Sequence, residues 1–373
     1  MVKLLTHGLL KSVVCCLTLS VLLSCSLHEQ KFSKNDVLET YSAPKEALFV
    51  SNQDGDREIY LTKLDGTGLI QLTNNSSDDY EASWSPQGDK IVFTSNRIKG
   101  NTEVYLMNAD GTSLVNISNS PGFDGRASWS PDGEFIAFNS ARSGVEQIFL
   151  WHRSTGTITQ VTDSQYMSSL PTWSPDGKWI AYQNFGKSHK ADLWITSLDG
   201  AKNRQLTSHK KSEDGAFDWS PDSTKIAFHS RRDYRYNLYV YDLNLNQEFQ
   251  LTHTYTSDVQ PKWSASGDVI MFMSNRGQYG RTQICLMQED GTEQRCITDS
   301  RYQAGDPTWL NDNSILHSNW NGKRFSNIYL LDLGTEQLIP LAPAIGYQSQ
   351  PIPRPEVLPN KKPVMTGQQL ARR

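Results

Sequence analysis

The sequence is poor in cysteine and histidine and has no surplus of positive charge. Five cysteines and eight histidines occur among 373 residues, and they form neither an H-E-x-x-H motif nor a clustered zinc set. No two glycines stand four residues apart, which excludes the G-x-S-x-G turn of serine hydrolases. The formal net charge is −4 without a long basic stripe, unlike most nucleic-acid binders. The sequence therefore predicts no catalytic residue, no metal, no cofactor and no nucleic-acid partner.

Helical periodicity is also lacking after residue 25, and a repeat of another kind takes its place. The phrase "ASWSPDGEFIAFNSAR" at residues 127–142 recurs in variant form along the chain. The spacings between successive copies of its tryptophan are 45, 44, 46, 44 and 46 residues. A fixed period of this length indicates a solenoid, a propeller or an array. The marker tryptophans are Trp84, Trp129, Trp173, Trp219, Trp263 and Trp309.

Each period contains the signals of four short strands, which we call a, b, c and d. Strand a carries the tryptophan, strand b is "EFIAFNS" in the third set, strand c is "EQIFLWHR", and strand d ends in "VT". Both faces of strand b are apolar, as in a strand buried on two sides. Strands c and d are joined in several copies by Asp-Gly, a strong hairpin signal. Four antiparallel strands at this period predict a propeller blade.

The number of blades follows from the two ends of the repeat. Sets of b, c and d strands occur seven times, whereas strand a with its tryptophan occurs six times. The first set lacks an inner strand, and "YQSQPIP" at Tyr347 stands where an extra one is expected. We predict an all-β, seven-bladed propeller in which this C-terminal strand completes the first blade and removes exposed sheet edges. A six-bladed ring is the alternative.

The N-terminus predicts export and a lipid anchor. A weakly basic start precedes the short apolar stretch "SVVCCLTLSVLLS", which is typical of a signal peptide rather than a membrane span. "LLSC" at residues 22–25 is similar to a lipoprotein cleavage motif, with Cys25 as the lipidated residue. An ordinary signal peptide with an incidental cysteine is the alternative. Serine at position 26, by resemblance to Gram-negative lipoproteins, favours the outer membrane.

These observations divide the chain into four parts. We expect a signal peptide at 1–24, a polar tether at 25–44, the propeller at 45–353 and a flexible tail at 354–373. The protein is then a monomer that faces the periplasm from the outer membrane.

Two further cysteines, Cys285 and Cys296, fall on strands c and d of one set. In its own strand, each cysteine is the neighbour of the Ile or Leu that recurs in the other repeats. We therefore expect both side chains on the same face of the sheet, opposite each other across a two-residue turn. A disulfide is expected in an oxidising compartment, and two buried thiols are the alternative.

The combined motifs "WSPDGxxIAF", "SNR", "xIYxMNxDGT" and "xLT" resemble the repeat of the TolB propeller family over residues 45–350. That repeat also occurs in non-catalytic propellers of prolyl-oligopeptidase relatives. The resemblance implies a binding module rather than an enzyme, with envelope proteins or glycans as partners. Oligogalacturonate lyase, a seven-bladed propeller with a manganese site of His and Gln, is the enzymatic alternative. His189, His209, His229 and His253 could meet on one rim, but the paired His-x-His expected of that family is missing.

The b–c and d–a loops vary between repeats and open on one face, so we expect binding there. Basic and aromatic residues gather in three successive loops and predict a patch for an anionic glycan or an acidic protein; a solvated rim is the alternative. The patch comprises Lys187, His189, Lys190, Lys210, Lys211, Arg231, Arg232, Arg235 and Tyr236.

Acidic residues recur five positions before the tryptophan in four copies, at Asp79, Asp124, Asp214 and Asp258. They predict either an acidic ring at the channel mouth or a local role, in which each Asp caps its own turn or pairs with the arginine of "SNR"; we favour the local role. Asp54 and Asp56 beside Gly55 only faintly resemble a calcium loop, and we expect a hairpin turn there.

Overall fold

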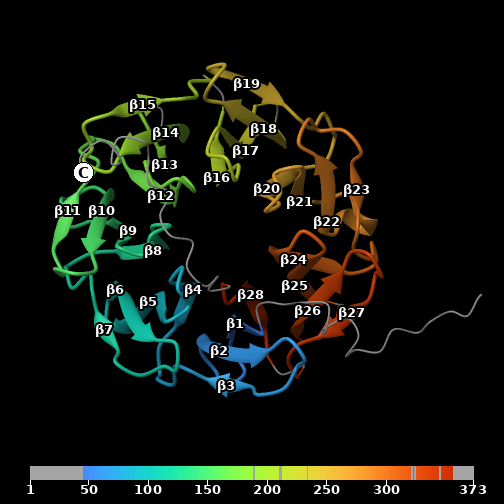
Figure 1. The fold of residues 1–373 in the computed structure, drawn as a ribbon, viewed down its shortest axis with the longest axis horizontal. Coiled ribbons are helices and arrows are strands. Elements are labelled where there is room, and N and C mark those ends of the chain that lie inside the picture. Colours follow the sequence, from blue (N-terminus) through green and yellow to red (C-terminus); the bar gives the residue numbers. More distant parts are fainter. Residues whose placement is uncertain are drawn as a thin grey trace, which may run out of the picture.

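The computed structural model describes residues 45–355, except 188–189, 210–211, 233, 321, 323–324 and 344–345. The predicted signal peptide, Cys25, the tether and most of the predicted tail lie outside the described residues. The described chain forms a ring of seven four-stranded antiparallel sheets, with one strand of each sheet lining the centre (Figure 1). The seven-bladed prediction is confirmed, and the six-bladed alternative is wrong.

We number the blades so that blade 1 contains β1. The a strands of blades 1 to 7 are β28 (Gln348–Pro353), β4 (Asp79–Trp84), β8 (Asp124–Trp129), β12 (Ser168–Trp173), β16 (Asp214–Trp219), β20 (Asp258–Trp263) and β24 (Gln303–Asn311). The b strands are β1 (Glu46–Ser51), β5 (Lys90–Ile98), β9 (Phe135–Ser140), β13 (Trp179–Asn184), β17 (Lys225–Arg231), β21 (Val269–Ser274) and β25 (Ser314–Trp320).

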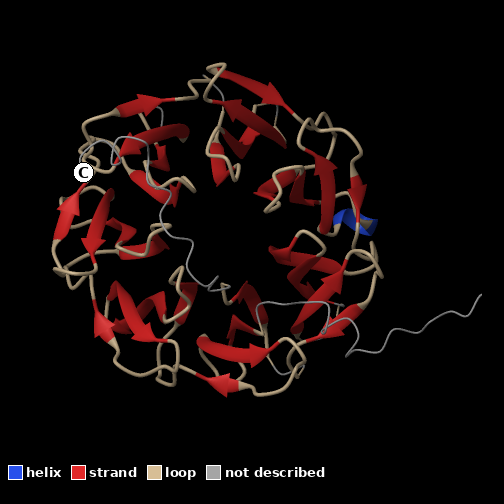
Figure 2. Ribbon diagram, viewed as in Figure 1, coloured by secondary structure: helices blue, strands red, loops and turns tan. Residues whose placement is uncertain are grey.

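The outer half of each blade is built by the c and d strands. The c strands are β2 (Glu58–Lys63), β6 (Asn101–Asn108), β10 (Gln147–His152), β14 (Asp192–Ser197), β18 (Tyr236–Asp242), β22 (Gln283–Gln288) and β26 (Ser326–Asp332). The d strands are β3 (Ile70–Gln71), β7 (Val115–Asn116), β11 (Ile158–Gln160), β15 (Asn203–Gln205), β19 (Gln247–Gln250), β23 (Arg295–Cys296) and β27 (Leu338–Pro340). A 3-10 turn, η1 (Gln278–Gly280), interrupts the b–c loop of blade 6 (Figure 2). Within residues 45–355, no helix has the length and apolar character needed to span a bilayer.

The core lies between the blades rather than inside any one of them. Leu48 and Ile59 of blade 1, for example, pack with Phe93 and Tyr105 of blade 2. Apolar clusters of this kind fill all seven interfaces. Two-sided burial explains why both registers of the b strands are apolar in the sequence.

The repeated tryptophans also connect neighbouring blades. The indole Nε1 of Trp173 donates to the carbonyl of Ser128 at 3.0 Å, and that of Trp219 to Thr172 at 3.1 Å. Each acceptor belongs to the preceding blade. The same bond recurs at Trp309 but not at Trp84, Trp129 or Trp263, whose Nε1 has no partner among the described residues. All six tryptophans pack in the apolar cluster between their own blade and the preceding one, and this packing contact has the period seen in the sequence.

The C-terminal strand closes the ring, as the sequence predicts. β28 pairs antiparallel with β1, with Leu48 opposite Ile352 and Ser51 opposite Gln348. Beyond the strand, the guanidinium of Arg354 lies 2.6 Å from the Glu46 carboxylate. The first blade therefore has its inner strand from one end of the chain and its outer strands from the other (Figure 1).

The two faces of the ring differ in regularity. The a–b and c–d turns open on one face, and several c–d turns are alike: the Oδ1 of Asp110 accepts the Thr112 N–H at 3.0 Å, and Asp290 accepts that of Thr292 at 2.9 Å. Side-chain caps of this type fix a turn locally. The b–c and d–a loops open on the opposite face, which we call the loop face, and they differ in length and sequence from blade to blade.

Cys285 and Cys296 lie directly opposite each other on β22 and β23 and are joined as a disulfide. We predict that the unfolded, unreduced protein contains no free thiol from this pair, as counted with a chromogenic thiol reagent. Reduction should lower the free energy of unfolding by about 2–4 kcal/mol, because the crosslink restricts the unfolded chain. Two reactive thiols in the unreduced protein would contradict this pairing.

Candidate functional site

Buried ion pairs occupy the inner ends of several blades next to the loop face. Arg97 lies 2.8 Å from Asp79, Arg142 lies 3.4 Å from Asp124, and Arg276 lies 3.0 Å from Asp258. All three aspartate side chains are fully buried, so they do not form an open acidic ring at the channel mouth. The pairing interpretation of the sequence is confirmed in these three blades.

Blade 5 departs from the pattern. Arg232 makes a two-pronged ion pair with Glu248 on β19, at 2.6 and 2.8 Å. Asp214 accepts instead from the hydroxyl groups of Ser230 and Thr207. The arginine turns away from its predicted partner because the d strand of this blade carries a carboxylate within reach.

The structure describes only part of the predicted basic patch. Lys187 and Arg235 are exposed, Lys190 and Tyr236 are partly buried, and His189, Lys210 and Lys211 lie outside the described residues. Arg231 pairs with Glu213 at 2.8 Å, and Arg232 pairs with Glu248. The two arginines are therefore already compensated by carboxylates of the same chain.

Three tyrosines stand out on the loop face of blades 5 and 6. Tyr234, Tyr255 and Tyr279 are 99%, 89% and 87% exposed. Tyr234 and Tyr279 lie in the b–c loops of the two blades, and Tyr255 lies in the d–a loop that joins them. The backbone of Tyr234 and Tyr279 is left-handed, with φ of 65° and 58°, which is rare for bulky residues. We call these three residues the tyrosine rim.

The tyrosine rim was not predicted from the sequence. Fifteen tyrosines are spread over the chain, and most of the repeated ones are strand residues. The usable signal was position, because Tyr234, Tyr255 and Tyr279 all fall in loops between the strands.

The central channel is lined by a ring of bulges. Each a strand shifts register at a bulge, and β24 does so twice. One bulge residue in each strand is left-handed, as at Glu81 with φ of 53° and Arg126 with φ of 55°. The remaining five bulge residues are Leu170, Ala216, Gln260, Asp306 and Gln350. Bulges redirect side chains and often adjoin functional sites.

Side chains connect these bulges from blade to blade. Gln350 Oε1 accepts the N–H of Glu81 at 3.1 Å, and Glu81 Oε2 accepts the N–H of Arg126 at 3.3 Å. Two cavities of about 330 Å³ each open into the channel, and Gln350 and Ile352 line both of them. The closing strand therefore supplies part of the channel wall as well as the ring closure.

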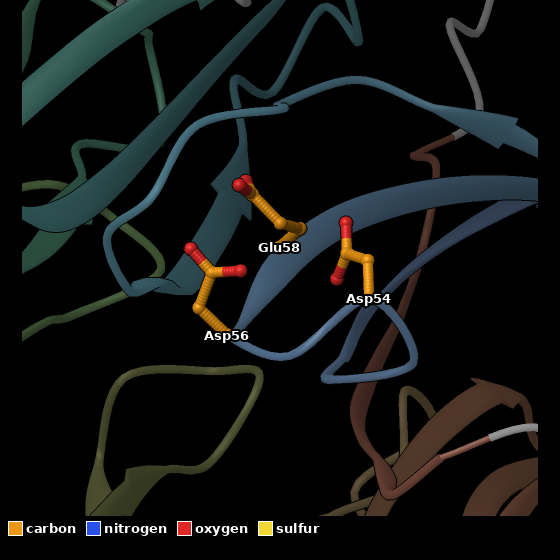
Figure 3. Close-up of side chains that lie close together, drawn as sticks. All are labelled: Asp54, Asp56 and Glu58. Carbon is orange, nitrogen blue, oxygen red and sulfur yellow. The ribbon is translucent and has the colours of Figure 1, made fainter.

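An acidic cluster lies in the b–c loop of blade 1 and the start of β2. Ligand atoms of Asp54, Asp56 and Glu58 all lie within 4.8 Å of one another (Figure 3). Asp54 accepts from the Gln71 amide at 2.6 Å, and Glu58 accepts the Asn75 N–H at 2.6 Å. The loop is a hairpin connection as predicted, and Glu58 serves to hold the following d–a loop.

Burial raises the pKa of Glu58 to about 7, with the neighbouring Asp79 adding to the effect. The folded protein therefore binds a proton at Glu58 between about pH 4 and 7 that the unfolded chain does not bind, so this group favours folding more as the pH falls. We predict that Glu58→Gln raises the melting temperature at pH 8 and changes it little at pH 5. A melting-temperature gain that grows toward pH 5 would contradict the shift.

The histidines named for a metal site do not assemble one in the part of the chain that the structure describes. His209 and His253 are exposed on d–a loops, His229 is largely buried on β17, and His189 is not described. Among described residues, the one group of three or more potential ligands within 4.8 Å contains no histidine. Burial lowers the pKa of His229 to about 4, which keeps its imidazole neutral.

Comparison with known proteins places these features in a family. The model of the TolB beta propeller domain matches residues 159–365, more than half of the chain. The chain belongs to the TolB beta propeller domain family. A curated relative, the Tol-Pal system protein TolB of Desulfosudis oleivorans, is 38% identical over 52 residues, which make up 14% of this chain and 12% of that protein.

Solved structures agree in fold with this TolB-like propeller. TolB of Acinetobacter baumannii is similar with a TM-score of 0.54 and 16% identity, over 87% of this chain and 86% of that one. Oligogalacturonate lyase of Vibrio parahaemolyticus has a TM-score of 0.62 and 12% identity, over 79% and 88%. The aligned regions span between 11% and 38% of the length of four curated relatives. At these identities, likeness to the solved structures shows the fold alone.

Proposed function

We propose that this TolB-like propeller is a non-catalytic lipoprotein of the bacterial cell envelope. It is held in the outer membrane through Cys25 and binds proteins or envelope polymers with its loop face. The short apolar N-terminus and the "LLSC" motif support the anchor. The name of the TolB relative, which refers to the Tol-Pal system, supports an envelope protein as the partner.

The observation that carries the binding role is the tyrosine rim. Tyrosine brings a large contact area at a small cost in side-chain entropy, and tyrosine and arginine dominate binding hot spots. Arg281 lies 6.0 Å from the Tyr279 ring, and Arg231 lies 5.8 Å from the Tyr236 ring. An exposed ring beside an arginine on an irregular loop, as at Tyr279, is typical of a recognition surface.

We predict that replacing Tyr234, Tyr255 and Tyr279 together by serine abolishes capture of envelope partners. The melting temperature should stay within about 2 °C, because side chains this exposed contribute little to stability. Quantitative pull-down from detergent-solubilised envelope measures the first effect, and thermal unfolding measures the second.

Leu245 provides the matched control. It is 64% exposed in the c–d turn of blade 5, at the opposite end of β18 from Tyr234. Leu245→Ser removes an exposed apolar side chain from the other face and should leave capture intact. Equal loss in both variants would show that capture depends on surface apolarity in general rather than on the loop face.

An enzyme related to oligogalacturonate lyase is the second candidate, favoured by the shared ring architecture. Metal analysis of the purified protein, together with ultraviolet absorbance of unsaturated products, tests it directly. Bound manganese with product formation would replace the binding role by a catalytic one.

A further inference from the structure

In four blades, an arginine of the blade itself fills the groove between that blade and the preceding one. We call this arginine and its contacts the internal plug. The arginine of the "SNR" motif lies over the aromatic ring of strand b or c, as Arg97 does at 5.5 Å from Phe93 and 4.5 Å from Tyr105. Its Nε donates to the serine two residues earlier, at 2.9 Å for Arg97 and Ser95. Arg142, Arg232 and Arg276 repeat both contacts in blades 3, 5 and 6.

Blade 7 has lost this plug at each position. His317 pairs with Tyr329 in the register in which Phe93 pairs with Tyr105, so histidine replaces the ring that is Phe or Tyr in the six other blades. Asn319 replaces Ser95, and Ala304 replaces the buried aspartate. The position of the arginine is Asn321 in the sequence, which lies outside the described residues.

The groove is hollow in blade 7 and nearly closed in blade 2. In blade 2, the cavity lined by Leu72, Arg97 and Leu114 measures about 140 Å³. In blade 7, the cavity lined by the corresponding Ile297 and Leu338 measures about 380 Å³. That volume lies in the range of small-molecule sites.

The floor of the larger cavity presents hydrogen-bond acceptors without donors. The His317 side chain is fully buried, and its Nδ1 lies 3.0 Å from the carbonyl of Ser318. A carbonyl only accepts, so Nδ1 carries the proton and Nε2 presents a lone pair. Among the described residues, neither Nε2 of His317 nor the buried Oδ1 of Asn319 has a hydrogen-bond partner. Unmatched buried acceptors of this kind are costly unless a ligand satisfies them.

The walls favour a flat cation. The rings of His317 and Tyr329 are stacked at 6.0 Å, as those of Phe93 and Tyr105 are in the plugged blade 2. Tyr302 and the carboxylates of Asp299 and Glu336 also line the cavity. Asp299 already pairs with Arg301 at 2.6 Å, which leaves Glu336 as the uncompensated charge among the described lining residues.

We propose that the groove between blades 6 and 7 binds a guanidinium group supplied from outside the blade, such as the arginine side chain of a partner protein. Its N–H groups donate to His317 Nε2 and Asn319 Oδ1, and its plane lies on Tyr329, in the arrangement that Arg97 adopts in blade 2. The inference does not depend on the tyrosine rim or on a lipid anchor.

The first test uses small molecules on the purified full-length protein. N-acetyl-arginine methylamide should bind, as measured by calorimetry and by a dose-dependent rise in melting temperature. The uncharged, nearly isosteric N-acetyl-citrulline methylamide and the lysine analogue should bind at least about tenfold more weakly. Equal binding of all three, or no binding of the arginine compound to any form of the protein, would overturn the proposal.

Two variants test the residues. His317→Phe restores the ring of the other blades and removes the acceptor, so affinity should fall roughly tenfold or more without loss of folding. The double variant Ala304→Asp with Asn321→Arg rebuilds the internal plug and should abolish binding while raising the melting temperature. Unchanged affinity in both variants would contradict the assignment of the site.

The same measurements distinguish the sources of the guanidinium. Arg372 and Arg373 of this chain carry the group and lie outside the described residues. Arg324, also outside them, stands between β25 and β26 of blade 7 in the sequence, so filling of the groove by Arg324 would contradict a source outside the blade. If one of them fills the groove, its replacement by alanine increases the affinity for the arginine compound. If a partner fills it, these replacements change nothing, and His317→Phe weakens the captured complex.

Discussion

A chain that ends at residue 346 is expected to lose cooperative folding, whereas a chain that ends at residue 355 keeps it. The shorter chain lacks β28, so blade 1 has three strands and β1 exposes an unpaired inner edge. The lost ladder bonds are worth about 1 kcal/mol each, and further losses come from Ile352, which packs in the core between blades 1 and 2, and from the Arg354–Glu46 pair. We expect the free energy of unfolding to fall by about 5 kcal/mol or more.

Urea unfolding followed by tryptophan fluorescence compares the two chains. A peptide of residues 347–355 added to the shorter chain should raise its unfolding midpoint, because it can occupy the place of β28. An unchanged midpoint for the chain ending at 346 would contradict closure by the C-terminal strand.

Removal of the buried carboxylate in blade 6 is expected to have the second largest effect. Both oxygens of Asp258 accept from Arg276, at 3.0 and 3.1 Å, and Oδ2 also accepts from Thr254 at 2.9 Å. Asp258→Ala leaves the Arg276 guanidinium, which is 25% exposed, without its fully buried partner. Breaking a buried pair costs about 3–5 kcal/mol, and we expect about 2–4 because Arg276 retains some contact with water.

Glu289→Ala is the matched control for this substitution. Glu289 also makes an ion pair, with Lys225 at 2.7 Å, but its side chain is 50% exposed. Exposed pairs contribute at most about 1 kcal/mol. If the two variants shift the urea midpoint equally, the buried pair contributes no more to stability than the exposed pair, contrary to our expectation.

The sequence was sufficient for the ring and its closure because both follow from a repeated interblade contact. The tryptophan period, the Asp-Gly turns and the extra strand at Tyr347 each have a counterpart in the structure. The pairing of Asp79 with Arg97 could be predicted for the same reason, since both residues belong to the repeat. In blade 5 this reasoning failed for Arg232, because its partner Glu248 lies on a d strand that the repeat does not fix.

The loop face and the blade 7 groove were harder to predict for a different reason. The exposure of Tyr255 depends on the path of a loop, which no periodic pattern determines. His317 was visible only by superposing all seven repeats, where it is the one histidine at a Phe or Tyr position. Its unmatched Nε2 depends on the missing arginine as well as on the histidine itself.

The most direct test of the binding role is site-specific photocrosslinking in intact cells. A photoreactive residue at position 234, 255 or 279 should form crosslinks to the same partner. One at position 110, 155 or 245 should not, because these positions lie on the turn face, the face on which the a–b and c–d turns open. Crosslinks confined to the turn face, or the absence of crosslinks from all three rim positions, would contradict recognition through the loop face.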